Sequence, residues 1–178
     1  MTVALGLHPT FGNWAQITFL HMYLLLVRLR CFPPNQFPLY SQHLLDHFFH
    51  MAEDRMISHH NISARSIRNK YLKDFFLQWR GLQAGYDEGL IKGDAVFAAA
   101  VWRNVFQARE NVDWRGVGEV VSYVRGCLKA LEQLPDEVVV SGGGVTFGDP
   151  AGEREGVLIR SRLMLEKESC PTTVPYSE

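Results

Sequence analysis

The sequence contains little cysteine, no long uninterrupted apolar segment and almost no net charge. Its three cysteines, Cys31, Cys127 and Cys170, lie far apart and form no Cys-x-x-Cys pair. This arrangement argues against a disulfide framework and a cysteine-based zinc site, and it is typical of a reducing compartment. The net charge of −1 excludes a strong overall attraction to nucleic acid.

The short motifs of several enzyme classes are also missing. The glycines at 142–144 are not followed by the lysine and hydroxyl residue of a phosphate-binding loop, so we expect a flexible loop there. No Gly-x-Ser-x-Gly motif marks a serine nucleophile, and Cys31 has no identifiable base. We therefore predict neither a catalytic residue nor a cofactor.

The most apolar segment, Trp14 to Cys31, is too short and too interrupted to cross a membrane. Gln16, Thr18 and His21 break it and Arg28 ends it, which leaves about fourteen apolar residues where a bilayer span needs about twenty. Its apolar side chains point in every direction around a helix, a pattern typical of helices that are covered on all sides. The segment predicts a central core helix, with an exposed docking helix as the alternative.

The rest of the chain predicts four more helices and no sheet, because apolar residues recur with helical spacing and period-two alternation is absent up to residue 137. Prolines 33 and 34 end the first helix. The second helix is expected over residues 39–59. The third is expected over residues 64–84 or beyond, with Asn61 and Ser63 as breaking and capping residues before it and Gly89 and Gly93 marking its end. The fourth is expected after an Asp94 cap, and the fifth between an Asp113 cap and Pro135.

The residues after Pro135 differ in character, since they are rich in glycine and contain few bulky groups. We expect a loop or linker there, in which Val138–Val140 favour a short strand only weakly, and residues 157–169 are compatible with a late amphipathic helix. The predicted fold is therefore all-α: a single helical domain of about five helices over residues 7–135, followed by a Gly-rich, partly irregular tail over residues 136–178.

A stripe of histidines occupies one face of the second predicted helix. It comprises His43, His47, His50 and Asp54, which lie within roughly 60° of one another on a helical wheel. Imidazoles one turn apart can share a divalent metal, so one interpretation is a metal-dependent enzyme. The other is a solvated polar face, which we favour because three ligands from one straight helix converge poorly.

The third predicted helix carries the basic residues that we expect to bind a partner: Arg65, Arg68, Lys70, Lys73 and Arg80. Arg68 falls on the apolar face, where an unpaired charge is costly, so it is expected to pair with Glu53 or Asp54. A basic face beside Tyr71 and Trp79 is also compatible with RNA or ribosome docking. Nearby aromatic and methionine side chains offer an adaptable apolar surface, unless they fill the core: Phe48, Phe49, Met51, Met56, Phe75, Phe76 and Trp79.

Five segments of the chain, in order, resemble the ubiquinol–cytochrome c chaperone family. They are "WAQITFLHMYLLLVRLR", "YSQHLLDHFFHMAEDRM", "NISARSIRNKYLKDFFLQWRG", "YDEGLIKGDAVFAAAVWRNVF" and "VTFGDP". The resemblance runs from about Leu7 to Pro150, which is most of the chain.

The resemblance implies a non-enzymatic assembly factor for mitochondrial complex III. Such a factor is expected to bind newly made cytochrome b together with a small partner protein, near the mitochondrial ribosome and on the matrix side of the inner membrane, as a peripheral protein. The chain begins with "MTVALGLHPTFGN", which has no basic residue before its apolar letters, so we expect no transit or signal peptide in the chain as written.

Overall fold

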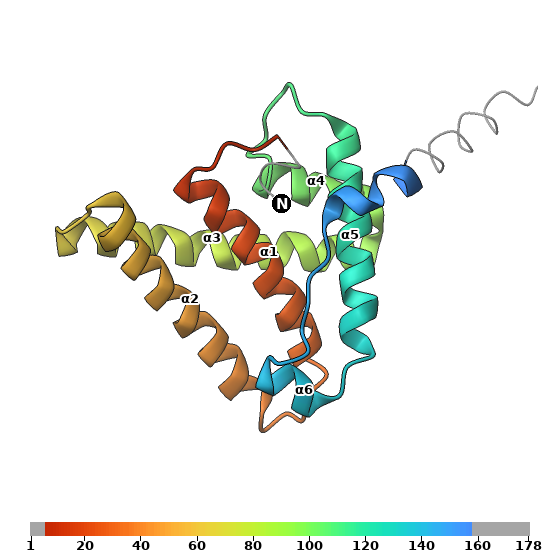
Figure 1. Ribbon diagram of the computed structural model, residues 1–178, viewed down its shortest axis with the longest axis horizontal. Coiled ribbons are helices and arrows are strands. Elements are labelled where there is room, and N and C mark those ends of the chain that lie inside the picture. The colour runs from red at the N-terminus through yellow and green to blue at the C-terminus, as the bar shows by residue number, and fades with distance from the viewer. Residues whose placement is uncertain (1–5, 158–178) are drawn as a thin grey trace, which may run out of the picture.

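The computed structural model describes residues 6–157, and within that range every regular element is a helix (Figure 1). This confirms the all-α prediction. The elements are α1 (Phe11–Leu29), α2 (Phe37–His60), α3 (Arg65–Lys92), α4 (Asp94–Asn104), α5 (Trp114–Glu132), α6 (Asp136–Ser141) and the 3₁₀ helix η1 (Pro150–Glu153). The five expected helices correspond to α1–α5, and α6 and η1 come in addition.

The predicted strand at Val138–Val140 is wrong, because these residues lie in α6. Pro135 precedes the helix with its φ fixed at −58°. Acidic residues occupy the first turn, where their negative charge interacts favourably with the positive end of the helix dipole. Gly142 then ends the helix with a positive φ of 69°. The late helix expected over residues 157–169 lies outside the described residues, apart from Val157.

Two of the expected helix caps are also corrected. Ala64, not Ser63, precedes α3, and Gly93, not Asp94, precedes α4. Asp94 instead forms the first residue of α4 and pairs with Arg125 of α5 at 2.8 Å. Asp113 does cap α5, since its carboxylate accepts a hydrogen bond from the backbone N–H of Arg115 at 3.0 Å.

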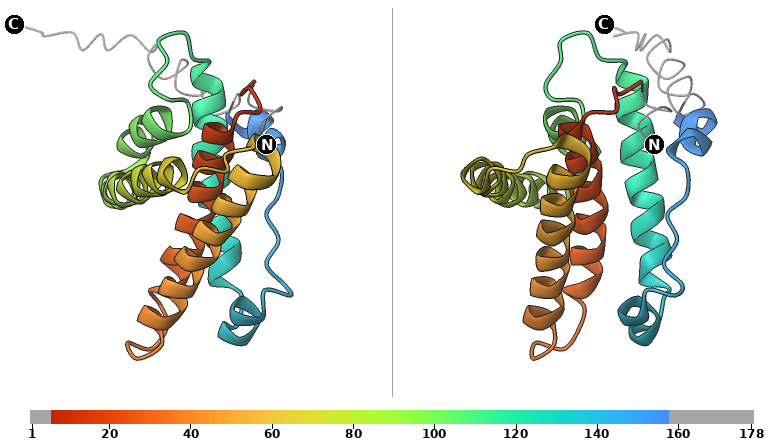
Figure 2. Two further views of the ribbon diagram at one scale, coloured as in Figure 1. Left: turned by 90° about the vertical axis from the view of Figure 1, so that its left-hand side faces the viewer. Right: turned by 60° about the vertical axis from the view of Figure 1, so that its left-hand side comes forward.

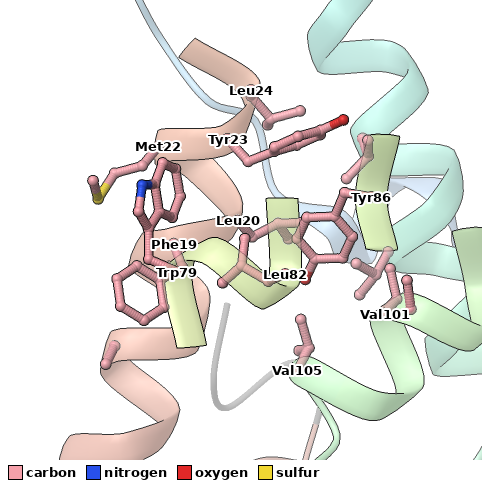
Figure 3. Close-up of a cluster of buried hydrophobic side chains, with 14 of the residues drawn as sticks. Phe19, Leu20, Met22, Tyr23, Leu24, Trp79, Leu82, Tyr86, Val101 and Val105 are labelled. Carbon is pink, nitrogen blue, oxygen red and sulfur yellow. The ribbon is translucent and has the colours of Figure 1, made fainter. Parts of the chain in front are cut away.

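Helix α1 lies at the centre of the molecule, between α2 and α5, with α3 crossing behind it (Figure 1). Most of its apolar side chains are buried, including Phe19, Leu20, Tyr23 and Leu24. Figure 3 shows Phe19, Leu20 and Tyr23 facing Trp79, Leu82 and Tyr86 of α3, with Val101 of α4 and Val105, the residue after α4, in the same cluster. The prediction of a central core helix is therefore confirmed. None of the described helices is both long and apolar enough to cross a membrane.

An aromatic cluster joins α1, α2 and α3 at one point. The ring of Phe19 lies 4.6 Å from that of Phe48 in α2, and 5.9 and 5.6 Å from those of Phe75 and Trp79 in α3, measured between ring centroids. Each large aromatic ring buries a large apolar area, and tilted ring pairs add a favourable electrostatic contribution. The cluster therefore holds the two outer helices against the central one.

Two arginines at the C-terminal end of α1, Arg28 and Arg30, join this helix to its neighbours. Arg30 donates to both carboxylate oxygens of Asp87 in α3 at 2.6 and 3.0 Å, and the hydroxyl of Tyr23 donates to the same carboxylate at 2.7 Å. Burial raises the pKa of Asp87, but the hydrogen bonds from Arg30 and Tyr23 outweigh that effect and lower it overall. Arg28 binds α5 instead, as it donates to the backbone carbonyls of Leu131 and Leu134 at 3.0 and 2.8 Å.

The segment after α6 runs back along α5 and covers part of α1 (Figure 2). Its Phe147 ring lies 4.6 Å from the imidazole of His21, and Pro150 is buried. The Nδ1–H of His21 donates to the carbonyl of Ile17, so Nε2 accepts from the hydroxyl of Tyr123, each at 2.8 Å. Burial lowers the pKa of His21, which favours this neutral form.

Gly89 sets how closely α3 and α4 approach each other. A Cβ atom at Gly89 would lie 2.5 Å from the Cα of Phe97 in α4. We therefore expect Gly89→Ala to lower the free energy of unfolding by about 1–3 kcal/mol, because the backbones must separate. Gly81, on the same helix, is the matched control: no atom lies within 4 Å of an added Cβ. Gly81→Ala should stabilise by about 0.5–1 kcal/mol. Urea unfolding followed by circular dichroism measures both, and equal effects would contradict the close packing.

Removal of the hydroxyl group should change the free energy of unfolding differently for two buried tyrosines of the core. The hydroxyl of Tyr86 has no hydrogen-bond partner among the described residues, whereas that of Tyr23 donates to Asp87. We expect Tyr86→Phe to leave the free energy of unfolding unchanged or to increase it, and Tyr23→Phe to lower it by about 1–2 kcal/mol. The same unfolding assay tests this, and a larger loss for Tyr86→Phe would show that its hydroxyl is satisfied.

Candidate docking surface on the helical arm

Helices α2 and α3 form a corner that projects away from α5 (Figure 1). Helix α2 ends at Asn61, which adopts the left-handed conformation with φ 52°, and α3 begins at Arg65. Asparagine tolerates this conformation better than most residues, which explains why the chain turns here. We call residues 47–80, which span this corner, the arm.

Arg68 fixes the geometry of the corner. Its side chain is only 13% exposed, and its Nε donates to Glu53 of α2 at 3.0 Å. The guanidinium also donates to the backbone carbonyls of Ile62 and Ser63 in the turn. The predicted pairing is thus confirmed, with Glu53 as the partner. These contacts hold Arg68 within the fold, so its predicted role in partner binding stays a prediction.

The other basic residues of α3 face solvent. Arg65, Lys70, Lys73 and Arg80 are all exposed, and within residues 6–157 none of them forms an ion pair. Lys70, Lys73 and Arg80 follow one line along the helix because they are three or seven residues apart. Leu77 lies on the same line and is 57% exposed. We call Lys70, Lys73, Leu77 and Arg80 the outer strip.

Exposed apolar side chains also concentrate on the arm. Ten large hydrophobic residues are exposed in the described part of the chain, and six of them belong to the arm: Met51, Ile57, Ile67, Tyr71, Phe76 and Leu77. Exposed apolar side chains that are concentrated in one part of a protein can mark a site of interaction with other proteins or with membranes. The arm therefore combines unpaired positive charge with accessible apolar groups.

The aromatic and methionine residues that the sequence nominated for a client surface divide into two groups. Phe48, Met56, Phe75 and Trp79 are buried in the core, whereas Met51 and Phe76 are exposed and Phe49 is half-buried. Sequence reasoning missed Leu77, although its spacing from Lys73 and Arg80 places it on the polar side of the helix. An apolar residue at such a position is the available sequence signal.

The histidine stripe lies on the solvent side of α2. His43, His47, His50 and Asp54 are all exposed, and Nδ1 of His50 is hydrogen-bonded to the backbone carbonyl of its own helix at residue 46, at 2.7 Å. Across residues 6–157, no three or more histidine, cysteine, aspartate or glutamate side chains are grouped so that they could hold a metal ion. The arrangement is that of a polar face, and the metal interpretation receives no geometric support from these residues.

A sequence model of the ubiquinol-cytochrome C chaperone family matches residues 3–147. The chain belongs to this family. The match includes the arm and all five long helices, and the family is one of chaperones rather than of enzymes.

Three relatives illustrate the range of similarity within the family. This chain is 39% identical over 138 residues to the mitochondrial protein CBP3 of Saccharomyces cerevisiae, covering 78% of this chain and 41% of that protein. It is 31% identical over 143 residues to ubiquinol-cytochrome c reductase complex assembly factor 1 of Homo sapiens, covering 78% and 45%. The Xenopus laevis assembly factor 1 is 26% identical over 148 residues, covering 80% and 69%.

The chain therefore spans less than half the length of these yeast and human relatives. No solved structure matches it.

Removing the Arg68 side chain should destabilise the corner of the arm. We expect Arg68→Ala to lower the free energy of unfolding by about 1–3 kcal/mol, since Glu53 loses its partner and two turn carbonyls lose a donor. Arg65→Ala, at an exposed and unpaired neighbour, should change it by less than about 0.5 kcal/mol. Thermal and urea unfolding compare the two variants, and similar values would argue against an anchoring role for Arg68.

Proposed function

We propose that this chain is the chaperone domain of an assembly factor for mitochondrial complex III, ubiquinol–cytochrome c reductase, and that it acts without catalysis. The match of residues 3–147 to the chaperone family carries this proposal. The names of the relatives support it, because the human protein is an assembly factor of that complex and the yeast protein is mitochondrial.

The client in this proposal is newly made cytochrome b, a membrane protein with long apolar helices. A chaperone for such a client needs an accessible apolar surface with charged groups around it, which keep the free surface soluble. The exposed apolar residues of the arm meet that requirement, and Leu77 lies between cations that form no ion pair within residues 6–157. We therefore assign client binding to the arm, centred on Phe76 and Leu77.

The cations of the outer strip suit a second part of the role. Lys70, Lys73 and Arg80 present positive charge that no described carboxylate neutralises, as a surface that approaches ribosomal RNA would require. The chaperone would then act close to the mitochondrial ribosome, on the matrix side of the inner membrane, together with a small partner protein. Attraction of this type weakens steeply as salt concentration rises.

Leu77 offers the sharpest test of client binding. In cells that produce the full-length protein with Leu77→Asp, we expect newly made cytochrome b to co-purify with it at least about fivefold less, because a charge placed in the apolar contact costs more than about 1 kcal/mol. Complex III should fall in parallel. Radiolabelling of mitochondrial translation products, followed by purification of the chaperone, measures the first effect.

Ile91 provides the matched control, since it is 85% exposed on the same helix but lies 14 residues, or about 21 Å, from Leu77. Ile91→Asp should leave both readouts unchanged. Equal losses in the two variants, or none in either, would exclude the arm as the client site. Deletion of the whole gene separates this from the broader role: unchanged cytochrome b and complex III after deletion would overturn the proposed function itself.

A further inference from the structure

A hollow of about 440 Å³ lies where the start of α1 meets the end of α2. Its walls include the aromatic rings of Phe11 and Trp14 and three side chains that carry or can gain positive charge, namely Arg55, His59 and His60. We propose that this hollow is a binding site for a phosphate group carried by a small molecule or a lipid. The site is separate from the outer strip and does not depend on the function proposed above.

Arg55 supplies the permanent charge of the hollow. Its guanidinium carbon lies 4.7 Å from the centre of the Trp14 ring, a stacking arrangement that holds the group in one place. Within residues 6–157 it forms no salt bridge, and no side-chain hydrogen bond uses its N–H groups. A stacked guanidinium keeps its N–H edge free, and that edge matches the oxygens of a phosphate.

The two histidines add imidazole rings to the wall of the hollow. The hydroxyl of Ser58 donates to the backbone carbonyl of Asp54 at 2.7 Å, so Nδ1–H of His59 donates to the Ser58 oxygen, also at 2.7 Å. Nε2 of His59 is therefore the ring nitrogen that has no hydrogen-bond partner among the described residues. The ring of His60 packs on Phe11 at 4.9 Å between centroids. A bound phosphate favours the doubly protonated imidazole, in which both ring nitrogens donate, so each histidine can supply a charged donor to it.

No carboxylate among the described residues lines this hollow. Asp74 lines an adjoining hollow, which shares Thr10, Phe11 and His60 with this one. Although the whole chain has a net charge of −1, this concave site thus brings together one guanidinium and two imidazoles with no carboxylate in its described lining. Its volume lies within the usual range for small-molecule sites, and a multiply charged anion such as a phosphate satisfies several such donors at once.

Calorimetric titration of the 178-residue chain with inorganic pyrophosphate tests the site. We expect Arg55→Gln to raise the dissociation constant about tenfold or more, and His59→Gln to raise it severalfold, since each removes a charged donor.

His47→Gln is the matched control, because His47 is an equally exposed histidine on the same helix and lies outside the hollow. It should bind pyrophosphate as the wild type does. If Arg55→Gln unfolds, because Trp14 loses its stacking partner, the exposed His59 variant still decides the question. A comparable loss in His47→Gln would overturn the proposal.

Vesicles identify the source of the phosphate. Phosphatidylcholine vesicles with and without phosphatidic acid are sedimented with the wild-type and His59→Gln chains. Sedimentation that requires phosphatidic acid, is competed by pyrophosphate and falls in His59→Gln supports the site with a lipid headgroup as its ligand. Pyrophosphate binding without such sedimentation supports the site with a soluble phosphate compound. Binding of neither probe overturns the proposal.

Discussion

The burial of α1 on all sides is the constraint on which the rest of the structure depends. An all-round apolar helix has no face to leave in water, so α2, α3 and α5 must each cover part of it. Phe19 contacts α2 and α3 together, while Arg28 and Arg30 tie the end of α1 to α5 and α3. Burial thus supplies the attraction between the helices, and the arginines fix where along α1 each neighbour lies.

The arm owes its exposed surface to the same constraint. The buried face of α3 packs against α1 and, towards its C-terminal end, against α4, where Gly89 allows the two backbones to approach closely. Its first half packs against α2 and α1, and among residues 6–157 no helix covers the outer strip. The fold therefore keeps apolar groups accessible at the corner without weakening the core, because the residues that stabilise the corner, Arg68 and Glu53, differ from those that are exposed.

The sequence alone predicted the all-α fold class, the five main helices and the central position of α1. The helix bounds could be predicted because prolines, Asn61, Gly93 and Asp113 end or cap helices through local chemistry. A strand was wrongly predicted at Val138–Val140 because β-branched residues favour strands. In the structure, Pro135 and Gly142 set the bounds of helix α6 instead. Adjacent aromatics such as Phe75 and Phe76 could not be assigned to core or surface without the packing of α2 and α3. The hollow beside Arg55 was also unpredictable, because residues about forty positions apart build it and no spacing links them.

The hydrogen bonds of Arg28 have a consequence for the order in which the protein folds as it is made. Its acceptors on the carbonyls of Leu131 and Leu134 lie 103 and 106 residues further along the chain. During synthesis, α1 therefore leaves the ribosome before α5 and is covered by α5 late, since non-local contacts must wait for their partner to leave the ribosome. Until α5 has been made, α1 exposes apolar surface that is prone to aggregation. A member of a chaperone family thus passes through a stage in which its own apolar helix is only partly covered.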